Sequence, residues 1–106
     1  MVSRITFEIE SKQDIEDLVD KIVEQSNSIT DEDLEKVPKQ YRYFFKSIIN
    51  SIVFSSRHDK HKHYIDVIVP FNIGKGKHVF DRIFGLSSRL KRIFKECKVD
   101  AKIKIV

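Results

Sequence analysis

The segment RHDKHKHYIDVIVPFNIGKGKH, residues 57–78, decides the fold that we predict for this chain. Alternate residues at its centre divide between two faces, with Ile65, Val67 and Val69 on one and Tyr64, Asp66 and Ile68 on the other. Apolar side chains on both faces are typical of a strand in the middle of a sheet. We expect this strand to span His61–Phe71.

A strand in that position needs neighbours for its backbone groups, and the residues before it offer one. We expect Ser51–Arg57 to pair with it as a hairpin, through a tight turn at His58–Lys60. The β-forming side chains of Ile52–Phe54 favour this arrangement. In the alternative, the preceding helix continues to Phe54 and the hairpin is lost.

Further elements are predicted upstream of the hairpin. Ser3–Glu10 alternates between apolar and polar residues, which indicates a strand with one buried face. Lys12 to about Gln25 has apolar residues at helical spacing, and Ser11 is expected to cap the start of that helix. A short helix opened by Thr30 is expected to run to about Lys36, and a longer one follows Pro38.

Downstream, an amphipathic helix is predicted from about Lys77 to Lys95, with Cys97 continuing its apolar stripe. The segment Gly85–Ser88 is expected to kink this helix or to split it in two. Alternation over Val99–Ile105 then indicates a closing strand.

The resulting order, β-α(α)-α-β-β-α-β, predicts one α+β domain over residues 1–106. It is the split βαβ or ferredoxin-like arrangement, a two-layer sandwich with an antiparallel sheet of about four strands and helices on one face. The first and third strands are expected side by side in the centre. The uncovered sheet face would carry Glu8, Tyr64, Asp66, Ile68, Lys102 and Lys104.

Charge divides sharply along the chain. Residues 1–36 hold eleven acidic and four basic side chains, a net of −7, whereas residues 37–106 hold sixteen basic and five acidic ones, a net of +11. Such a basic part attracts nucleic acid or another polyanion, or the two halves neutralise each other in the fold or across a homo-oligomer. The predicted nucleic-acid-binding residues are Arg57, Lys60, Lys62, Lys75, Lys77, Arg82, Arg89, Arg92 and Lys95. No aromatic residue is interleaved with the basic helix face, so contact with phosphates is the expected mode.

The segment Ile73–Lys77, IGKGK, opens the predicted C-terminal helix. Its backbone amides and lysines could hold a phosphate at the positive end of the helix dipole, or the segment is a plain turn. It resembles the Gly-x-x-Gly loop with which KH domains clamp a nucleic-acid backbone, but Lys77 stands where the last glycine would be.

The histidines of RHDKHKH provide a candidate metal site. His61 and His63 are two residues apart on a predicted strand, and His58 could join them from the turn to hold a divalent metal, the one cofactor that the sequence suggests. The His-x-His pair resembles the metal-binding pair of nucleases that nick single-stranded DNA through a tyrosine, which Tyr41 or Tyr43 would supply. Lys62 replaces the apolar residue that this family has between the histidines. A solvated turn is the favoured interpretation.

Glu8 and Asp66 are candidate metal-binding carboxylates on the uncovered sheet face, but pairing with Lys102 and Lys104 is the favoured interpretation. The sequence contains no Ser/His/Asp or Cys/His arrangement that indicates an enzyme, and Cys97 is expected to serve packing.

The sequence therefore predicts a small nucleic-acid-binding protein that contacts the phosphate backbone of DNA or RNA. The alternatives are a protein interaction or assembly module, homodimeric in one form, and a metal-dependent nuclease. No apolar run approaches the roughly 20 residues that span a bilayer, and the single cysteine suits a reducing compartment, so a cytoplasmic protein without membrane contact is expected.

Overall fold

The computed structural model describes residues 2–28 and 31–106. Its strands are β1 (Ser3–Glu10), β2 (Val53–Asp59), β3 (Lys62–Val69) and β4 (Lys102–Ile105). Its helices are α1 (Glu16–Ser26), α2 (Asp31–Leu34), α3 (Lys39–Ile48), the 3₁₀ turn η1 (Ile49–Ser51), α4 (Lys77–Phe84) and α5 (Leu86–Glu96). Within these residues, no helix is long and apolar enough to cross a membrane.

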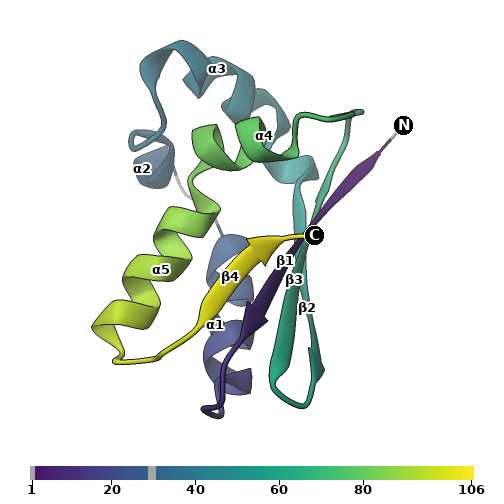
Figure 1. Cartoon of the computed structure of the whole chain (residues 1–106). Coiled ribbons are helices and arrows are strands. Elements are labelled where there is room, and N and C mark those ends of the chain that lie inside the picture. The colour runs from purple at the N-terminus through teal and green to yellow at the C-terminus, as the bar shows by residue number, and fades with distance from the viewer. Residues whose placement is uncertain (1, 29–30) are drawn as a thin grey trace.

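The four strands form one antiparallel sheet in the order β2-β3-β1-β4, and the helices lie against one of its faces (Figure 1). The predicted α+β class and antiparallel sheet are therefore confirmed. The first and third strands are paired in the centre, as the sequence predicts, with Ile5 opposite Val67 and Phe7 opposite Ile65.

The core lies between the sheet and the helices. Ile5, Phe7 and Ile9 of β1 are at most 1% exposed, and the inner residues of β3 are equally buried. Over them packs a group of phenylalanine rings from α3, β2 and α4, in which Phe45 makes the edge-to-face contacts that aromatic pairs favour and Phe54 is tilted against Phe84. These rings are Phe45, Phe54, Phe80 and Phe84.

The hairpin is confirmed, and the alternative of a helix continuing to Phe54 is wrong. The turn lies at Lys60 and His61, so it begins two residues later than predicted. Lys60 adopts a left-handed φ of 53°. His58 therefore belongs to β2, where it faces His63 across the ladder. The side chain of Asn27 holds the start of β2 in place. It donates to the carbonyl of Phe54 and accepts from the Phe54 amide, both at 2.9 Å.

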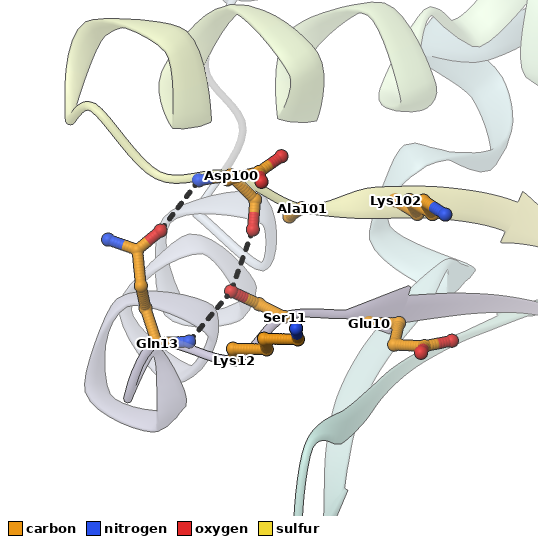
Figure 2. Close-up of a pocket in the computed structure, with 7 residues that line it drawn as sticks. All are labelled: Glu10, Ser11, Lys12, Gln13, Asp100, Ala101 and Lys102. Carbon is orange, nitrogen blue, oxygen red and sulfur yellow. Dashed lines mark hydrogen bonds between the residues drawn. The ribbon is translucent and has the colours of Figure 1, made fainter.

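The predicted cap at Ser11 is wrong. α1 begins at Glu16, and the Ser11 hydroxyl instead donates to the carbonyl of Asp100 at 2.9 Å and accepts from the amide of Gln13 at 3.1 Å. Figure 2 shows a third bond of this group, in which the side-chain oxygen of Gln13 accepts from the amide of Asp100 at 2.7 Å. We call the three hydrogen bonds among Ser11, Gln13 and Asp100 the Ser11 seam. The Ser11 hydroxyl thus bonds to a residue 89 positions away instead of capping the start of a helix. The predicted cap at Thr30 lies outside the described residues.

The C-terminal helix is split, one of the two predicted outcomes. Gly85, with φ 81°, ends α4 and immediately precedes α5, and the carboxylate of Asp81 accepts from the amide of Ser87 at 3.0 Å. Cys97 is exposed beyond the end of α5, so its predicted place in the apolar stripe is wrong. The closing strand is shorter than predicted because Asp100 is held by the Ser11 seam.

Candidate nucleic-acid interface

A basic groove lies on the helical side of the molecule, between α4–α5 and the turn that joins α2 to α3. It encloses about 550 Å³ and is continued toward the end of α1 by a second hollow of about 370 Å³. Lys36, Arg89 and Arg92 line both parts, and Arg82 lines the larger one. We call these four residues the basic groove.

The bend at Gly85 and helical spacing bring three of these cations together. Arg82 lies in the last turn of α4, while Arg89 and Arg92 are three residues apart on α5 and therefore share a face. Gly85 itself lines the groove between them. Arg82 and Arg92 are exposed to solvent.

Lys36 reaches the groove from the turn after α2. Arg42 holds that turn, because its guanidinium donates to the carbonyls of Glu35 at 2.8 Å and Val37 at 3.2 Å. Pro38 then starts α3 and forms part of the groove wall. The backbone around Lys36 is therefore fixed by a neighbouring helix.

Arg89 connects the groove to the body of the protein. Its guanidinium donates to the hydroxyl of Ser26, which is buried and itself donates to the carbonyl of Ile22 at 2.8 Å. This anchor fixes the orientation of Arg89, a half-buried cation that lines the groove.

The charged residues that line the groove in the described part of the chain are all basic. No Asp or Glu is present among the described residues that line either hollow. Cations that converge on a concave surface raise the local concentration of anions, because the low-dielectric walls focus their field. The groove is thus suited to anions, and its length across two hollows suits an extended one.

The other predicted basic residues lie elsewhere. Arg57 and Lys62 are on the uncovered sheet face, Lys60 is in the hairpin turn, and Lys75 and Lys77 flank the start of α4. Lys95 lies near the end of α5 without lining the groove. The structure therefore brings together three of the nine predicted residues and adds Lys36, which the sequence interpretation missed because it ends the acidic part of the chain.

Three basic residues of the uncovered sheet face, Arg57, Lys62 and Lys104, form ion pairs. Arg57 donates to both carboxylate oxygens of Asp66, at 2.7 and 3.2 Å, and its guanidinium lies 4.7 Å from the centroid of the Tyr64 ring. Burial tends to raise the pKa of Asp66, but hydrogen bonds from Arg57 and Thr6 outweigh it and hold that pKa below its ordinary value. The Arg57 charge is therefore already matched by a neighbouring anion.

Glu8 is paired in the same way. Lys104 lies 3.1 Å from one carboxylate oxygen and Lys62 lies 3.5 Å from the other. The hydrogen bond from Lys104 is the main reason that the pKa of Glu8 is lowered. The predicted pairing of Glu8 with Lys104 is confirmed, whereas Asp66 pairs with Arg57 instead of a lysine of β4.

The glycine-lysine segment is a closed turn. The amide of Ile73 donates to the Ser3 hydroxyl, that of Gly74 to the Asn72 side chain and that of Gly76 to the carbonyl of Ile73, all within 3.0 Å. These three donors are engaged inside the protein, which favours the plain turn over a phosphate cradle.

The histidines form a hydrogen-bonded chain with an acidic residue of α1. The Nδ1 atoms of His58 and His63 are 2.7 Å apart, and His58 Nε2 lies 2.7 Å from the carboxylate of Asp20. Burial, followed by the charge of His58, lowers the pKa of His63. His61 lies apart in the exposed turn. Among the described residues, no group of three or more His, Cys, Asp or Glu side chains is arranged to hold a metal ion, and metal binding stays a prediction.

Comparisons with protein-family models, with curated proteins and with solved structures give no match for this chain.

Proposed function

We propose that this protein binds nucleic acid by contacting its phosphate backbone in the basic groove. One observation carries the proposal: Lys36, Arg82, Arg89 and Arg92 come from three segments of the chain and line one concave surface, and no carboxylate lines it among the residues that the structure describes. Phosphate contacts of this kind supply affinity that is largely independent of sequence.

The proposal makes a quantitative statement about salt. Phosphate contacts from the three exposed cations, Lys36, Arg82 and Arg92, release about three counterions, so the logarithm of the binding constant should fall against the logarithm of salt concentration with a slope between about −2.1 for single strands and −2.7 for duplex. Fluorescence polarisation with labelled oligonucleotides measures this slope directly.

The decisive variant is Arg82→Ala combined with Arg92→Ala, because both side chains are exposed and neither has a packing role to lose. It should weaken binding and make the negative slope shallower by about 1.4 to 1.8. The matched control is Lys12→Ala with Lys102→Ala, which removes the same charge from exposed residues around a different hollow. Absence of binding at low salt, or equal losses in variant and control, would remove the proposal.

We further assign the architecture to the ferredoxin-like class. Support comes from the strand order, with β1 and β3 paired in the centre and β2 and β4 at the edges, and from helices on one face (Figure 1). This arrangement leaves the helical layer to form the basic groove and the opposite sheet face uncovered.

A second candidate function, assembly into a homodimer, is favoured by that uncovered face. Val53 and Ile68 are cross-strand partners on it, and Val53 is 50% exposed. Two such faces meeting would bury both side chains. Light scattering over a wide concentration range tests this, with Val53→Arg expected to shift dimer to monomer. A wild-type protein that stays monomeric at every concentration would exclude it.

A further inference from the structure

An apolar groove adjoins the basic groove on the other side of α4. It encloses about 430 Å³ between α3, the β3–α4 loop and α4, and no charged residue lines it within the described part of the chain. The lining residues that matter here are Tyr41, Phe44, Phe71, Val79 and Ile83. We call these five residues the aromatic groove.

Phe44 is the centre of this surface because it is exposed and yet held in place. Its side chain is 46% exposed, which is unusual for a phenylalanine. Its ring packs edge-to-face against Phe71, at a centroid distance of 5.5 Å, and against Phe45, at 5.7 Å. These contacts fix the ring orientation while leaving part of it available to a ligand.

The two grooves are adjacent. Ile83 lines both of them, and its neighbour Arg82 lines the basic one. An extended ligand can therefore lie in the basic groove and reach the aromatic groove across a single turn of α4. The sequence did not reveal this neighbourhood, because Phe44 and Arg82 are far apart in the chain.

The charges around the aromatic groove indicate what could occupy it. α3, which supplies Phe44, carries the exposed Lys39 and Lys46 and no acidic residue, whereas its Arg42 is bonded to the turn between α2 and α3. Lys75 lies in the β3–α4 loop, and Lys77 begins α4. An apolar surface for a flat group, bordered by cations, complements a ligand that has aromatic rings on an anionic backbone.

We infer that the protein prefers single-stranded nucleic acid, with an unpaired base packed against Phe44 in the aromatic groove and the adjoining phosphates in the basic groove. This inference rests on the proposed function and names its substrate. In a duplex the bases are paired and stacked, so they cannot reach Phe44, whereas the bases of a single strand can. Stacking on an aromatic side chain favours the single strand by about 5- to 150-fold per base.

The sequence provides a direct optical test, because the chain contains no tryptophan. The variant Phe44→Trp places a single indole in the aromatic groove, and a stacked base should quench its fluorescence. Tyr43→Trp is the matched control, because Tyr43 is 86% exposed on the same helix and does not line the groove. The ligands are an oligothymidylate of about twelve nucleotides, the matching duplex, and an acidic peptide with apolar side chains.

The expected result is strong quenching of the Phe44→Trp protein by the oligothymidylate, with little effect of the duplex and little change in the Tyr43→Trp protein. A second variant, Phe44→Leu, keeps an apolar side chain but removes the ring. It should weaken single-strand binding about fivefold or more, with duplex binding and the salt slope unchanged.

The outcomes separate the inference from the proposed function. Absence of binding to either nucleic acid would overturn both. Equal affinity for single strand and duplex, without quenching at Phe44→Trp, would overturn the inference and leave phosphate binding standing. Quenching by the acidic peptide alone would also overturn it, and would assign the aromatic groove to a protein partner. Circular dichroism of each variant confirms folding, and should Phe44→Leu unfold, the quenching of Phe44→Trp decides.

Discussion

His58 and His63 face each other across β2 and β3 with their Nδ1 atoms 2.7 Å apart, and the outer nitrogen of His58 contacts Asp20 at 2.7 Å. One of the two facing nitrogens must carry a proton and the other must accept it. His63 is only 3% exposed, so a charge on its ring is disfavoured by burial and by a charged His58.

This pair predicts that the fold loses stability in mild acid. The folded pKa of His63 lies below the unfolded value near 6.5, although Glu16, Asp14 and Asp20 act in the opposite direction. Between the two values the unfolded chain binds more protons, so stability is full above about pH 6.5 and declines as pH falls toward the folded pKa. Urea unfolding from pH 7.5 to 5 measures the decline.

The variant His63→Leu should reduce this pH dependence, whereas His61→Ala, in the exposed turn, should retain it. Unfolding curves for wild type and His63→Leu that change equally with pH would show that other groups are responsible.

Removal of the buried carboxylate on the sheet face should destabilise the fold. Asp66 is 4% exposed and accepts from Thr6 at 2.7 Å and from two nitrogens of Arg57. Asp66→Ala leaves the Thr6 hydroxyl and Arg57 without this partner, and should lower the free energy of unfolding by about 1 to 3 kcal/mol in chemical denaturation.

The contribution of Asp66 to stability changes at lower pH than that of His63. Because the folded pKa of Asp66 is lowered, its contribution is present above the unfolded value near 3.8 and is lost as pH falls through the folded value. The single variant Thr6→Val, which removes one of the hydrogen bonds, should cost less than Asp66→Ala. An equal or larger cost would mean that the ion pair with Arg57 contributes little.

Substitution of Gly85 should destabilise the bend between α4 and α5. A Cβ added there would meet no atom within 4 Å, so the cost comes from the backbone, whose φ is 81°. Gly85→Ala should lower stability by about 1 to 2 kcal/mol, measured as a shift in thermal midpoint. Gly85→Asn should cost less, since asparagine tolerates the left-handed conformation. If both variants were as stable as wild type, the bend would not depend on that torsion angle.

The seam at Ser11 should stabilise the closing strand. The hydroxyl of Ser11 is buried and joins the amide of Gln13 to the carbonyl of Asp100 (Figure 2). Ser11→Ala leaves both groups without this partner and should cost about 1 to 3 kcal/mol, with faster amide exchange in β4. The control is Ser28→Ala, because the exposed Ser28 hydroxyl lies just beyond α1 and donates to the carbonyl of Glu24 at 3.3 Å, far from β4 in the fold. Unchanged exchange in β4 would contradict the role of Ser11.

The strands were predictable because alternation reports burial directly. Ser3–Glu10 was predicted with the same bounds that β1 has, and the inner and outer faces of β3 are those expected from residues 64–69. The cap at Ser11 was not predictable, since its hydroxyl finds a partner 89 residues away. Local rules identify a residue able to cap, but not a distant carbonyl that competes for the same hydroxyl.

The candidate site was predictable only in part, for a similar reason. Helical spacing placed Arg82, Arg89 and Arg92 on one face, and all three line the basic groove. Counting charge along the chain hid Lys36, because the eleven acidic residues that precede it dominate that segment, while none of those that the structure describes lines the groove. The aromatic groove was missed because its two walls, α3 and α4, are separated by the whole hairpin.

The bend at Gly85 also sets the curvature of the surface. A continuous helix would present Arg82, Arg89 and Arg92 along a straight, convex ridge, spaced by 1.5 Å per residue. Because one left-handed glycine interrupts it, the same side chains border a hollow together with Lys36. The curvature that an extended ligand would meet on the α4–α5 side of the groove therefore depends on one backbone torsion, while the arginine side chains supply its charge.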